Sequence, residues 1–248
     1  MSSSFHLQGK DVLIIGATSQ IGGAIARAVV LNGGRVFLCG RNEEKLAALA
    51  ASLQASVLGV RTFDYQDVSE VREFIKEMEP FTSLLFAGGF VPRLMPFRLT
   101  DDGVAESIMS VNFGAPAGFL RELLRARKLS DGASCVFINS VAAGGSPEAT
   151  AYYSAAKAAL LSLLRSVGSE YARRKMRFNS VAYGYIRGET IERLGVTAER
   201  LQLAPLGVPT AEEVVGAPLF LLSDASRWIT RKTLVVDGGV NLKQHWVI

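Results

Sequence analysis

The sequence predicts a single-domain α/β fold in which helices cover both faces of a doubly wound, parallel β-sheet of about seven strands. Short apolar runs rich in β-branched residues alternate with longer helical patterns along all 248 residues. No linker or low-complexity segment interrupts this alternation. Hydrophobic residues make up 49% of the chain and charged residues 20%, a balance typical of a compact domain. We therefore predict one domain over residues 1–248.

Each element is predicted from its own run of residues. The strand candidates are DVLIIG (11–16), RVFLC (35–39), VLGVRTF (57–63), SLLFAG (83–88), SCVFIN (134–139), RFNSVA (177–182) and TLVVDG (233–238). The helical patterns lie near 20–32, 42–53, 67–78, 101–128, 151–175 and 210–223, and the loops 89–98 and 184–208 break the rhythm. Ligands of open parallel sheets bind beyond the carboxyl ends of the strands, so the residues after each strand are the candidate site.

Composition argues against several classes of protein. The only histidines, His6 and His245, lie near the chain ends, which disfavours a Ser-His-Asp hydrolase and a histidine-ligated zinc site. Cys39 and Cys135 lie in apolar strand candidates, so we expect core residues rather than a disulfide. The net charge is +4, but the basic residues are scattered apart from a cluster at 173–177, at a predicted helix end. We therefore expect no nucleic-acid partner.

The chain shows no signal for membrane insertion. Its first residues, MSSSFHLQGK, have neither a basic region nor a long apolar region, and no later stretch has 18 uncharged apolar residues. We therefore expect no signal peptide, no membrane span and a cytoplasmic location.

A glycine-rich loop follows the first strand candidate. In GATSQIGGAIA (16–26), the glycines allow a tight turn and a close backbone approach to a phosphate, whose charge the following helix N-terminus favours. Because the pattern is not the usual GxGxxG, plain turn chemistry remains an equal alternative. After the second strand, Arg41 is suited to a ribose 2′-phosphate and favours NADP(H) over NAD(H). The alternative is an exposed arginine near Glu43 or Glu44.

The stretch AYYSAAKAAL (151–160) places two tyrosines and a lysine on one predicted helix. Residues four apart share a helix face, so Tyr153 lies beside Lys157, whereas Tyr152 points elsewhere and is expected to pack. An adjacent ammonium favours the phenolate, and we expect it to lower the pKa of Tyr153, which then serves as a general acid or base. Ser140, just past a strand end, is placed to hydrogen-bond the substrate oxygen that Tyr153 protonates.

Together these motifs resemble the classical short-chain dehydrogenase/reductase family. The resemblance is carried by Ser140, by Tyr153 and Lys157 in YSAAK, and by the glycine loop. Further similar stretches follow in the family's order over essentially the whole chain. These are Asp64, AGG at 87–89, VNFGA with Asn112, NSVAYGYI at 179–186 and ITRKTLVVDGG at 229–239. The resemblance implies a Rossmann-type fold and hydride transfer between a nicotinamide and a carbon that bears oxygen.

The resemblance also implies roles for individual residues. Tyr153 would donate or accept the proton, Lys157 would lower its pKa and hold the nicotinamide ribose, and Ser140 would orient the carbonyl. Asn112 would bend its helix and hold a water in the proton relay; a polar helix residue bonded to its own backbone is the alternative. The cofactor-binding candidates are Gly16, Thr18, Ser19, Gln20, Ile21, Gly22, Arg41, Asp64, Tyr65, Ala87, Gly88, Gly89, Tyr153, Lys157, Tyr183, Gly184, Ile186 and Thr190.

The chain departs from the family's pattern at the cofactor site. Gln20 replaces the middle glycine of the loop, Ser19 stands where NADP-preferring members often have a basic residue, and Gly188 stands where a threonine often meets the carboxamide; Thr190 is the possible substitute. Phe86 and Ala87 replace paired asparagines, and Tyr183 replaces a proline. These departures leave open the alternative that the chain is a catalytically slow nucleotide sensor or scaffold. A further alternative is an epimerase or dehydratase that uses the same tyrosine.

We expect a ketone or secondary alcohol with a hydrophobic body as the substrate. Its expected wall consists of Phe90, Val91, Pro92, Ala142, Ala143, Tyr183 and Tyr185, together with the loop from about 184 to 208. Arg187 and Arg93 would meet an acidic group on the substrate or lie in solvent. The resemblance further implies a homo-oligomer, a tetramer or dimer, and no metal.

Overall fold

The computed structural model describes residues 5–240 and contains the predicted doubly wound parallel sheet. All strand pairs are parallel, in the order β3-β2-β1-β4-β5-β6-β7. The strands are β1 (Asp11–Ile15), β2 (Arg35–Gly40), β3 (Val57–Thr62), β4 (Phe81–Phe86), β5 (Leu129–Ser140), β6 (Arg177–Tyr183) and β7 (Thr233–Val236). Each overlaps its predicted run, so the predicted α/β fold is confirmed.

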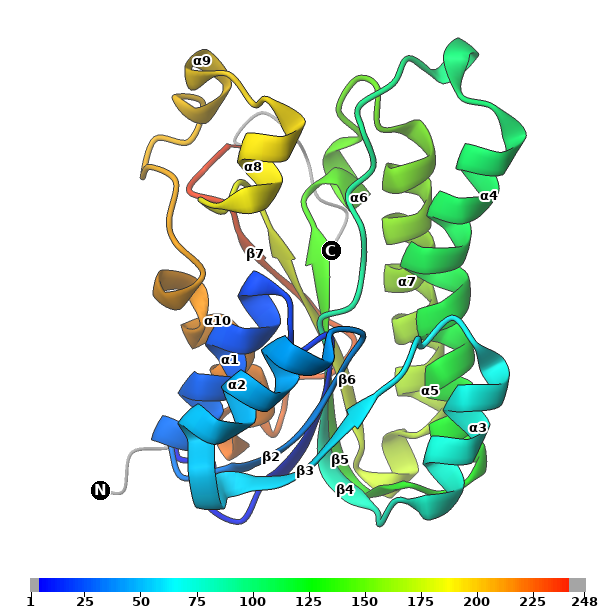
Figure 1. Cartoon of the computed structure of the whole chain (residues 1–248), viewed down its shortest axis with the longest axis vertical. Coiled ribbons are helices and arrows are strands. Elements are labelled where there is room, and N and C mark those ends of the chain that lie inside the picture. The colour runs from blue at the N-terminus through cyan, green and yellow to red at the C-terminus, as the bar shows by residue number, and fades with distance from the viewer. Residues whose placement is uncertain (1–4, 241–248) are drawn as a thin grey trace.

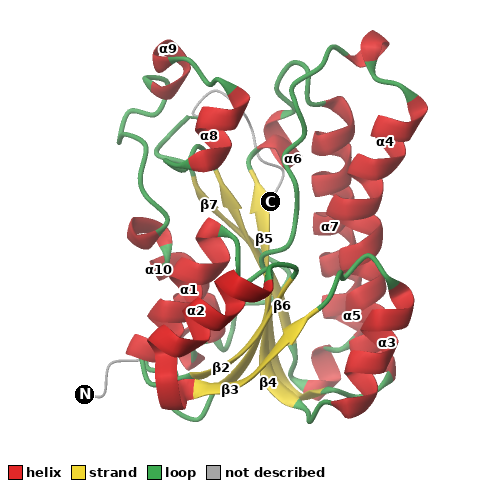
Figure 2. Ribbon diagram, viewed as in Figure 1, coloured by secondary structure: helices red, strands yellow, loops and turns green. Residues whose placement is uncertain are grey.

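Helices cover both faces of this sheet. They are α1 (Gln20–Leu31), α2 (Glu43–Leu53), α3 (Val68–Glu77), α4 (Asp102–Met109), α5 (Ala115–Arg125), α6 (Ala142–Gly145), α7 (Ala151–Glu170), α8 (Glu189–Leu194), α9 (Ala198–Leu201) and α10 (Gly216–Leu222). Figure 1 shows α3, α5 and α7 on one side of the sheet and α1, α2 and α10 on the other. In Figure 2, α8 and α9 lie beyond the carboxyl ends of the last strands.

Polar side chains fix where four of the helices begin. Ser19, Asn42, Asp67 and Asp101 precede α1, α2, α3 and α4, and the side chain of each accepts a hydrogen bond from a backbone N–H of the first turn. Such caps satisfy donors that have no partner within the helix. The helix at the glycine loop therefore starts at a defined residue, Gln20.

The alternation of side chains along the strands divides the core into two layers. Leu13 and Ile15 of β1 pack with residues of α3, α5 and α7, whereas Val12 and Ile14 pack with residues of α1, α2 and α10. Both layers are buried, as the period of two along a strand requires when each face of a sheet is covered. Cys39 and Cys135 are buried without a disulfide, which confirms that they are core residues.

The structure corrects three predicted boundaries. The helical pattern at 101–128 is interrupted by a π turn (Ser110–Gly114) between α4 and α5, and β5 begins at Leu129 rather than 134. The helix predicted to reach residue 175 ends at Glu170. Arg177 is not at a helix end but buried in β6, where its guanidinium donates to the carbonyls of Leu221 and Ser223.

Within residues 5–240, no helix is long and apolar enough to cross a membrane. That part of the chain likewise contains no group of three or more His, Cys, Asp or Glu side chains placed to hold a metal ion. His245 lies outside the described residues.

Candidate active site

The glycine loop at the carboxyl end of β1 packs backbone against backbone at Gly16 and Gly22. Gly16 has a φ of +82°, and a Cβ there would lie 2.8 Å from the carbonyl carbon of Ala87. A Cβ at Gly22 would lie 2.2 Å from the Gly16 carbonyl oxygen. Neither position accepts a larger residue, so the backbone itself lines the start of α1.

The loop after β4 is fixed by one buried amide. Asn112 lies in the π turn, where its Oδ1 accepts from the Phe90 N–H at 3.1 Å and its Nδ2 donates to the Phe90 carbonyl at 3.0 Å. Its Nδ2 also donates to the Ile108 carbonyl at 3.1 Å. A Cβ at Gly89 would lie 3.2 Å from Lys157 Nζ and 3.3 Å from Asn112 Oδ1. Asn112, Gly89 and Lys157 therefore meet at one point.

The structure brings Ser140, Tyr153 and Lys157 together. Tyr153 and Lys157 lie one turn apart on α7, and their side chains are buried, with Lys157 Nζ 5.8 Å from the centre of the Tyr153 ring. Ser140 ends β5, and its Oγ accepts a hydrogen bond from the Ala142 N–H at 3.2 Å. Ser140 also lies close enough to Tyr153 to lower the pKa of its hydroxyl. The predicted catalytic side chains therefore lie near one another at the carboxyl end of β5, with Ser140 half-buried and the other two buried.

Burial controls the electrostatics of this group. Desolvation raises the pKa of Tyr153 to about 12, and the neighbouring Ser140 side chain opposes that rise. Burial lowers the pKa of Lys157 to about 8, because the interior disfavours its ammonium form. Desolvation is the dominant effect at Tyr153, so the net shift of its pKa is upward, and the expected lowering of this pKa by Lys157 stays a prediction.

The second tyrosine of the motif has a packing role, as its place on the helix predicts. The Tyr152 ring is half-buried and lies 5.7 Å from the ring of Phe97, centre to centre. Tyr153 packs with Ile108 and Ala142, and Tyr152 packs against the outside of this cluster. The two tyrosines therefore occupy different faces of α7, and only Tyr153 faces Ser140 and Lys157.

Arg41 projects from the carboxyl end of β2 as predicted. Its guanidinium is 69% exposed and lies 3.9 Å from a carboxylate oxygen of Asp64, which is a loose surface ion pair. Next to Asp64, burial raises the pKa of Tyr65 to about 12. The Tyr65 ring packs on Gly88, where a Cβ would lie 2.7 Å from it. Asp64, Tyr65 and Gly88 are therefore neighbours just beyond the carboxyl ends of β3 and β4.

The residues after β6 divide into buried and accessible ones. Tyr183 is buried and its hydroxyl donates to the Val214 carbonyl at 2.9 Å. Its side chain therefore belongs to the core and does not form the predicted substrate wall. Gly184 is required by β7, since a Cβ there would lie 2.8 Å from Asp237 Cα. Ile186 is half-buried and Thr190 is exposed at the start of α8.

Phe86 explains why the sheet needs no asparagine beneath the site. The Phe86 ring is buried, stacks on Phe137 at 5.4 Å and meets Tyr65 edge-on at 5.2 Å. Apolar and aromatic packing replaces the polar bracing that the family pattern has at this position. The substitution at Phe86 is therefore accommodated within the core.

The segment from 184 to 208, here called the capping segment, contacts both sides of the site. Gln20 Nε2 donates to the Arg187 carbonyl at 2.6 Å. On the other side, Arg193 Nη2 donates to the Val91 carbonyl at 2.9 Å, and its guanidinium lies 5.1 Å from the centre of the Phe90 ring. The sequence did not point to Arg193, because only the folded position of α8 brings it to this loop.

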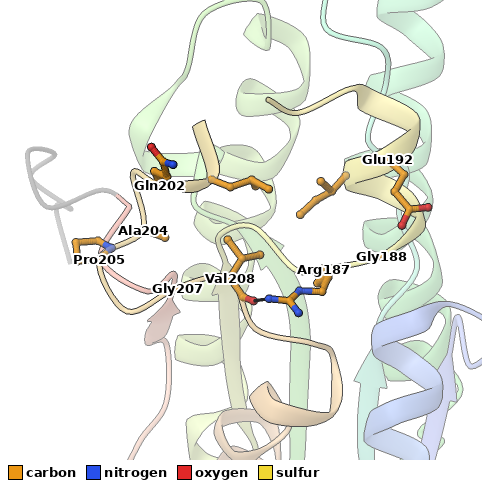
Figure 3. Close-up of a pocket in the computed structure, with 10 residues that line it drawn as sticks. Arg187, Gly188, Glu192, Gln202, Ala204, Pro205, Gly207 and Val208 are labelled. Atoms are coloured by element: carbon orange, nitrogen blue, oxygen red, sulfur yellow. Dashed lines mark hydrogen bonds between the residues drawn. The ribbon is translucent and has the colours of Figure 1, made fainter. Parts of the chain in front are cut away.

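A cavity of about 500 Å³ lies within the capping segment, between residues 187–192 and 201–208. Figure 3 shows Arg187 beside it, with the guanidinium bonded to the Val208 carbonyl at 3.3 Å. Ser140, Tyr153 and Lys157 do not line this cavity. Arg187 is thus held within the capping segment, which argues against its predicted contact with an acidic substrate.

The doubly wound parallel sheet places the chain in the class of Rossmann-type α/β proteins, and comparison with known proteins identifies the family within that class. A family model described as Enoyl-(Acyl carrier protein) reductase matches residues 16–241. The chain therefore belongs to the short-chain dehydrogenase/reductase family. It is an oxidoreductase that acts on a CH–OH or C=O group, as its relatives are named to do.

Relatives align over nearly the whole chain. The 3-oxoacyl-[acyl-carrier-protein] reductase FabG of Rickettsia conorii is 29% identical over 94% of this chain and 98% of its own. The galactitol 2-dehydrogenase (L-tagatose-forming) of Cereibacter sphaeroides is 30% identical over 95% of this chain and 96% of its own. A solved short-chain dehydrogenase/reductase (glucose/ribitol dehydrogenase) from Brucella melitensis has a TM-score of 0.86 at 26% identity and covers 96% of this chain and 98% of its own.

Proposed function

We propose that the chain is an NADP(H)-dependent reductase of ketones, or the matching alcohol dehydrogenase, that uses Ser140, Tyr153, Lys157 and Asn112. The observation that carries the proposal is the buried Tyr153, one helical turn from the buried Lys157, whose Nζ lies 5.8 Å from the centre of the Tyr153 ring. The other residues of the site are proposed to bind the cofactor and to line the substrate.

The residues present fit a dinucleotide. The glycine loop offers bare backbone, since a Cβ at Gly16 or Gly22 meets other backbone within 3 Å. It leads into the N-terminus of the 12-residue helix α1, which favours a phosphate. Arg41 is largely exposed and is suited to a 2′-phosphate, which favours NADP(H) over NAD(H). When bound, the cofactor supplies the hydride.

The side chains of the site then supply proton transfer and orientation. Ser140 Oγ donates to the substrate carbonyl oxygen, and the Tyr153 hydroxyl gives that oxygen its proton as negative charge develops there. A pKa raised to about 12 keeps Tyr153 protonated at neutral pH, which suits the direction of reduction. The Lys157 ammonium stabilises the phenolate that remains. Asn112 fixes the loop after β4, and the water that it would hold remains a prediction.

The wall of the site favours a substrate with a hydrophobic body. Phe90 is 48% exposed, Val91 is half-buried and Ala142 is buried beside Tyr153. The names of the relatives suggest 3-oxoacyl thioesters and ketoses as the first panel to screen. Of these we favour the thioesters, because apolar walls bind an acyl chain better than a polyol.

Turnover by two tyrosine variants tests the proposal. Tyr153→Phe removes the proton donor, and we expect about a thousandfold loss of kcat with NADPH affinity changed less than about twofold. Tyr152→Phe is the matched control and retains most activity, because that ring only packs. The measurement is NADPH oxidation with the ketone panel, together with fluorescence titration of NADPH. Equal losses from both variants, or no nucleotide binding by the unmodified protein, would overturn the proposal.

A further inference from the structure

Gln20 connects two segments that are 167 residues apart in the sequence. It is the first residue of α1, and its Nε2 donates to the Arg187 carbonyl at 2.6 Å. Arg187 lies in the capping segment, immediately before Gly188 and α8. The side chain thus spans from the glycine loop to the start of the capping segment.

Glycine is the one residue type at position 188 that leaves room for the Gln20 side chain. Its φ is +137°, and a Cβ there would lie 2.3 Å from Gln20 Oε1 and 2.5 Å from Gln20 Nε2. The amide of Gln20 therefore occupies the space that a side chain at position 188 would need. The two departures from the family pattern, at 20 and 188, are therefore in direct contact with each other.

The position of this contact bears on the cofactor. Under the proposed function, the loop 16–22 receives the phosphates of the dinucleotide, and the capping segment covers the substrate side. A hydrogen bond from that loop to the Arg187 carbonyl joins the two at the place where the phosphates approach. The same Nε2 is a donor that suits a phosphate oxygen.

We propose that Gln20 is a gate residue of the nucleotide site, a role that rests on the proposed function. Its amide holds the capping segment through the Arg187 carbonyl, and a cofactor phosphate competes for the same donor. Nucleotide entry breaks this bond, and Nε2 then donates to a cofactor phosphate. The capping segment is thereby released from the glycine loop when the cofactor binds.

Limited trypsin cleavage of the nucleotide-free protein tests the gate without any turnover. Cleavage after Arg187, Arg193 and Arg200 reports opening of the capping segment. Gln20→Ala and Gln20→Glu both lose the donor to Arg187, so we expect cleavage about fivefold faster in each, the effect of one hydrogen bond. Gln8→Ala, a change at another exposed glutamine, is the control and keeps the unmodified rate. Glutamate in the first turn favours the dipole of α1, so this variant is expected to fold.

Measurements of NADPH binding distinguish the bond of Gln20 to Arg187 from its proposed contact with a cofactor phosphate. Stopped-flow fluorescence should show faster association for Gln20→Ala, and its dissociation should also be faster because the phosphate contact is lost. Gln20→Glu should bind most weakly, since its carboxylate repels the phosphate. Unchanged trypsin cleavage in variants that bind NADPH normally would overturn the gate alone. If the unmodified protein binds neither NADPH nor NADH, the proposed function fails together with the gate.

Discussion

Lys157 and Tyr153 show at the scale of single residues how burial and function oppose each other. Without a cofactor, desolvation lowers the pKa of the lysine to about 8 and raises that of the tyrosine to about 12. Both shifts favour the neutral form, because the interior disfavours charge of either sign. The site therefore holds a protonated tyrosine ready to donate, and keeps the lysine ammonium at a cost in stability.

Lys157→Met is expected to stabilise the protein at pH 7. The pKa of Lys157 is about 8 in the folded chain and 10.5 in the reference state, so the unfolded chain binds its proton more tightly. The cost of the buried ammonium is complete below pH 8, reaches about 3 kcal/mol at most, and disappears as pH rises to 10.5. Met keeps the apolar stem of the side chain without its charge. The free energy of unfolding in urea, measured at pH 7 and pH 10, checks this.

The difference between the two proteins should shrink by pH 10. Tyr153 contributes in the opposite direction, since its raised pKa means that stability is lost between about pH 10 and pH 12. That loss only begins near pH 10, so it contributes little to the difference between the two proteins at the pH values measured. A stability gain of the same size at both pH values would contradict the buried-charge explanation.

At the scale of elements, the π turn between α4 and α5 places Asn112. Pro116, in the first turn of α5, has no N–H to donate to the Asn112 carbonyl four residues earlier. The Ala115 N–H bonds instead to the Ser110 carbonyl, five residues back, which is the π pattern. This wide turn sets Asn112 against Phe90.

Pro116→Ala should impair catalysis while leaving the fold intact. It restores the missing donor, so the helix closes to a regular α-helix and moves Asn112 away from the Phe90 backbone. We expect kcat to fall about tenfold or more, with a melting temperature no lower than that of the unmodified protein. Steady-state kinetics and thermal unfolding measure the two quantities. Pro218→Ala, at a buried proline of α10, is the control, and equal kcat losses from both variants would contradict the role of the turn.

The elements also show what the sequence could and could not predict. The strands were predictable, because fully buried parallel strands are continuous apolar runs such as that of β1. The pairing of Tyr153 with Lys157 followed from helix periodicity alone. The break in the helix at Asn112 was expected only from the family resemblance, since the apolar pattern itself continues through the π turn. The contacts of Gln20 and Arg193 depend on where the 184–208 segment folds, and no local pattern carries that information.

At the scale of the whole molecule, the predicted homo-oligomer remains a prediction to be tested by sedimentation. Several large apolar side chains are exposed within residues 5–240, including Leu99, Leu206 and Trp228, which is 87% exposed. Exposed apolar surface of this kind is consistent with an interface between copies of the chain. The cytoplasmic location likewise remains a prediction.

Cofactor preference is a property of the whole molecule, because a ligand that binds only the folded chain stabilises all of it. At a concentration of 100 times its Kd, NADPH should add about 2.7 kcal/mol. That corresponds to a rise in melting temperature of about 5–10 °C for a chain of this size. NADH at the same concentration should give a smaller shift, since it lacks the 2′-phosphate that Arg41 is proposed to bind.

Arg41→Ala makes this preference a test of one side chain. Loss of a charge-assisted contact should weaken NADPH binding about tenfold or more, and the shift with NADPH should fall to that with NADH. The shift with NADH should stay unchanged. Arg165→Ala, which removes an exposed arginine of α7, controls for the change in net charge and should retain the full NADPH shift. If Arg41→Ala reduces the NADPH and NADH shifts equally, Arg41 supports the nucleotide site without reading the 2′-phosphate, and the proposed preference for NADP(H) is wrong.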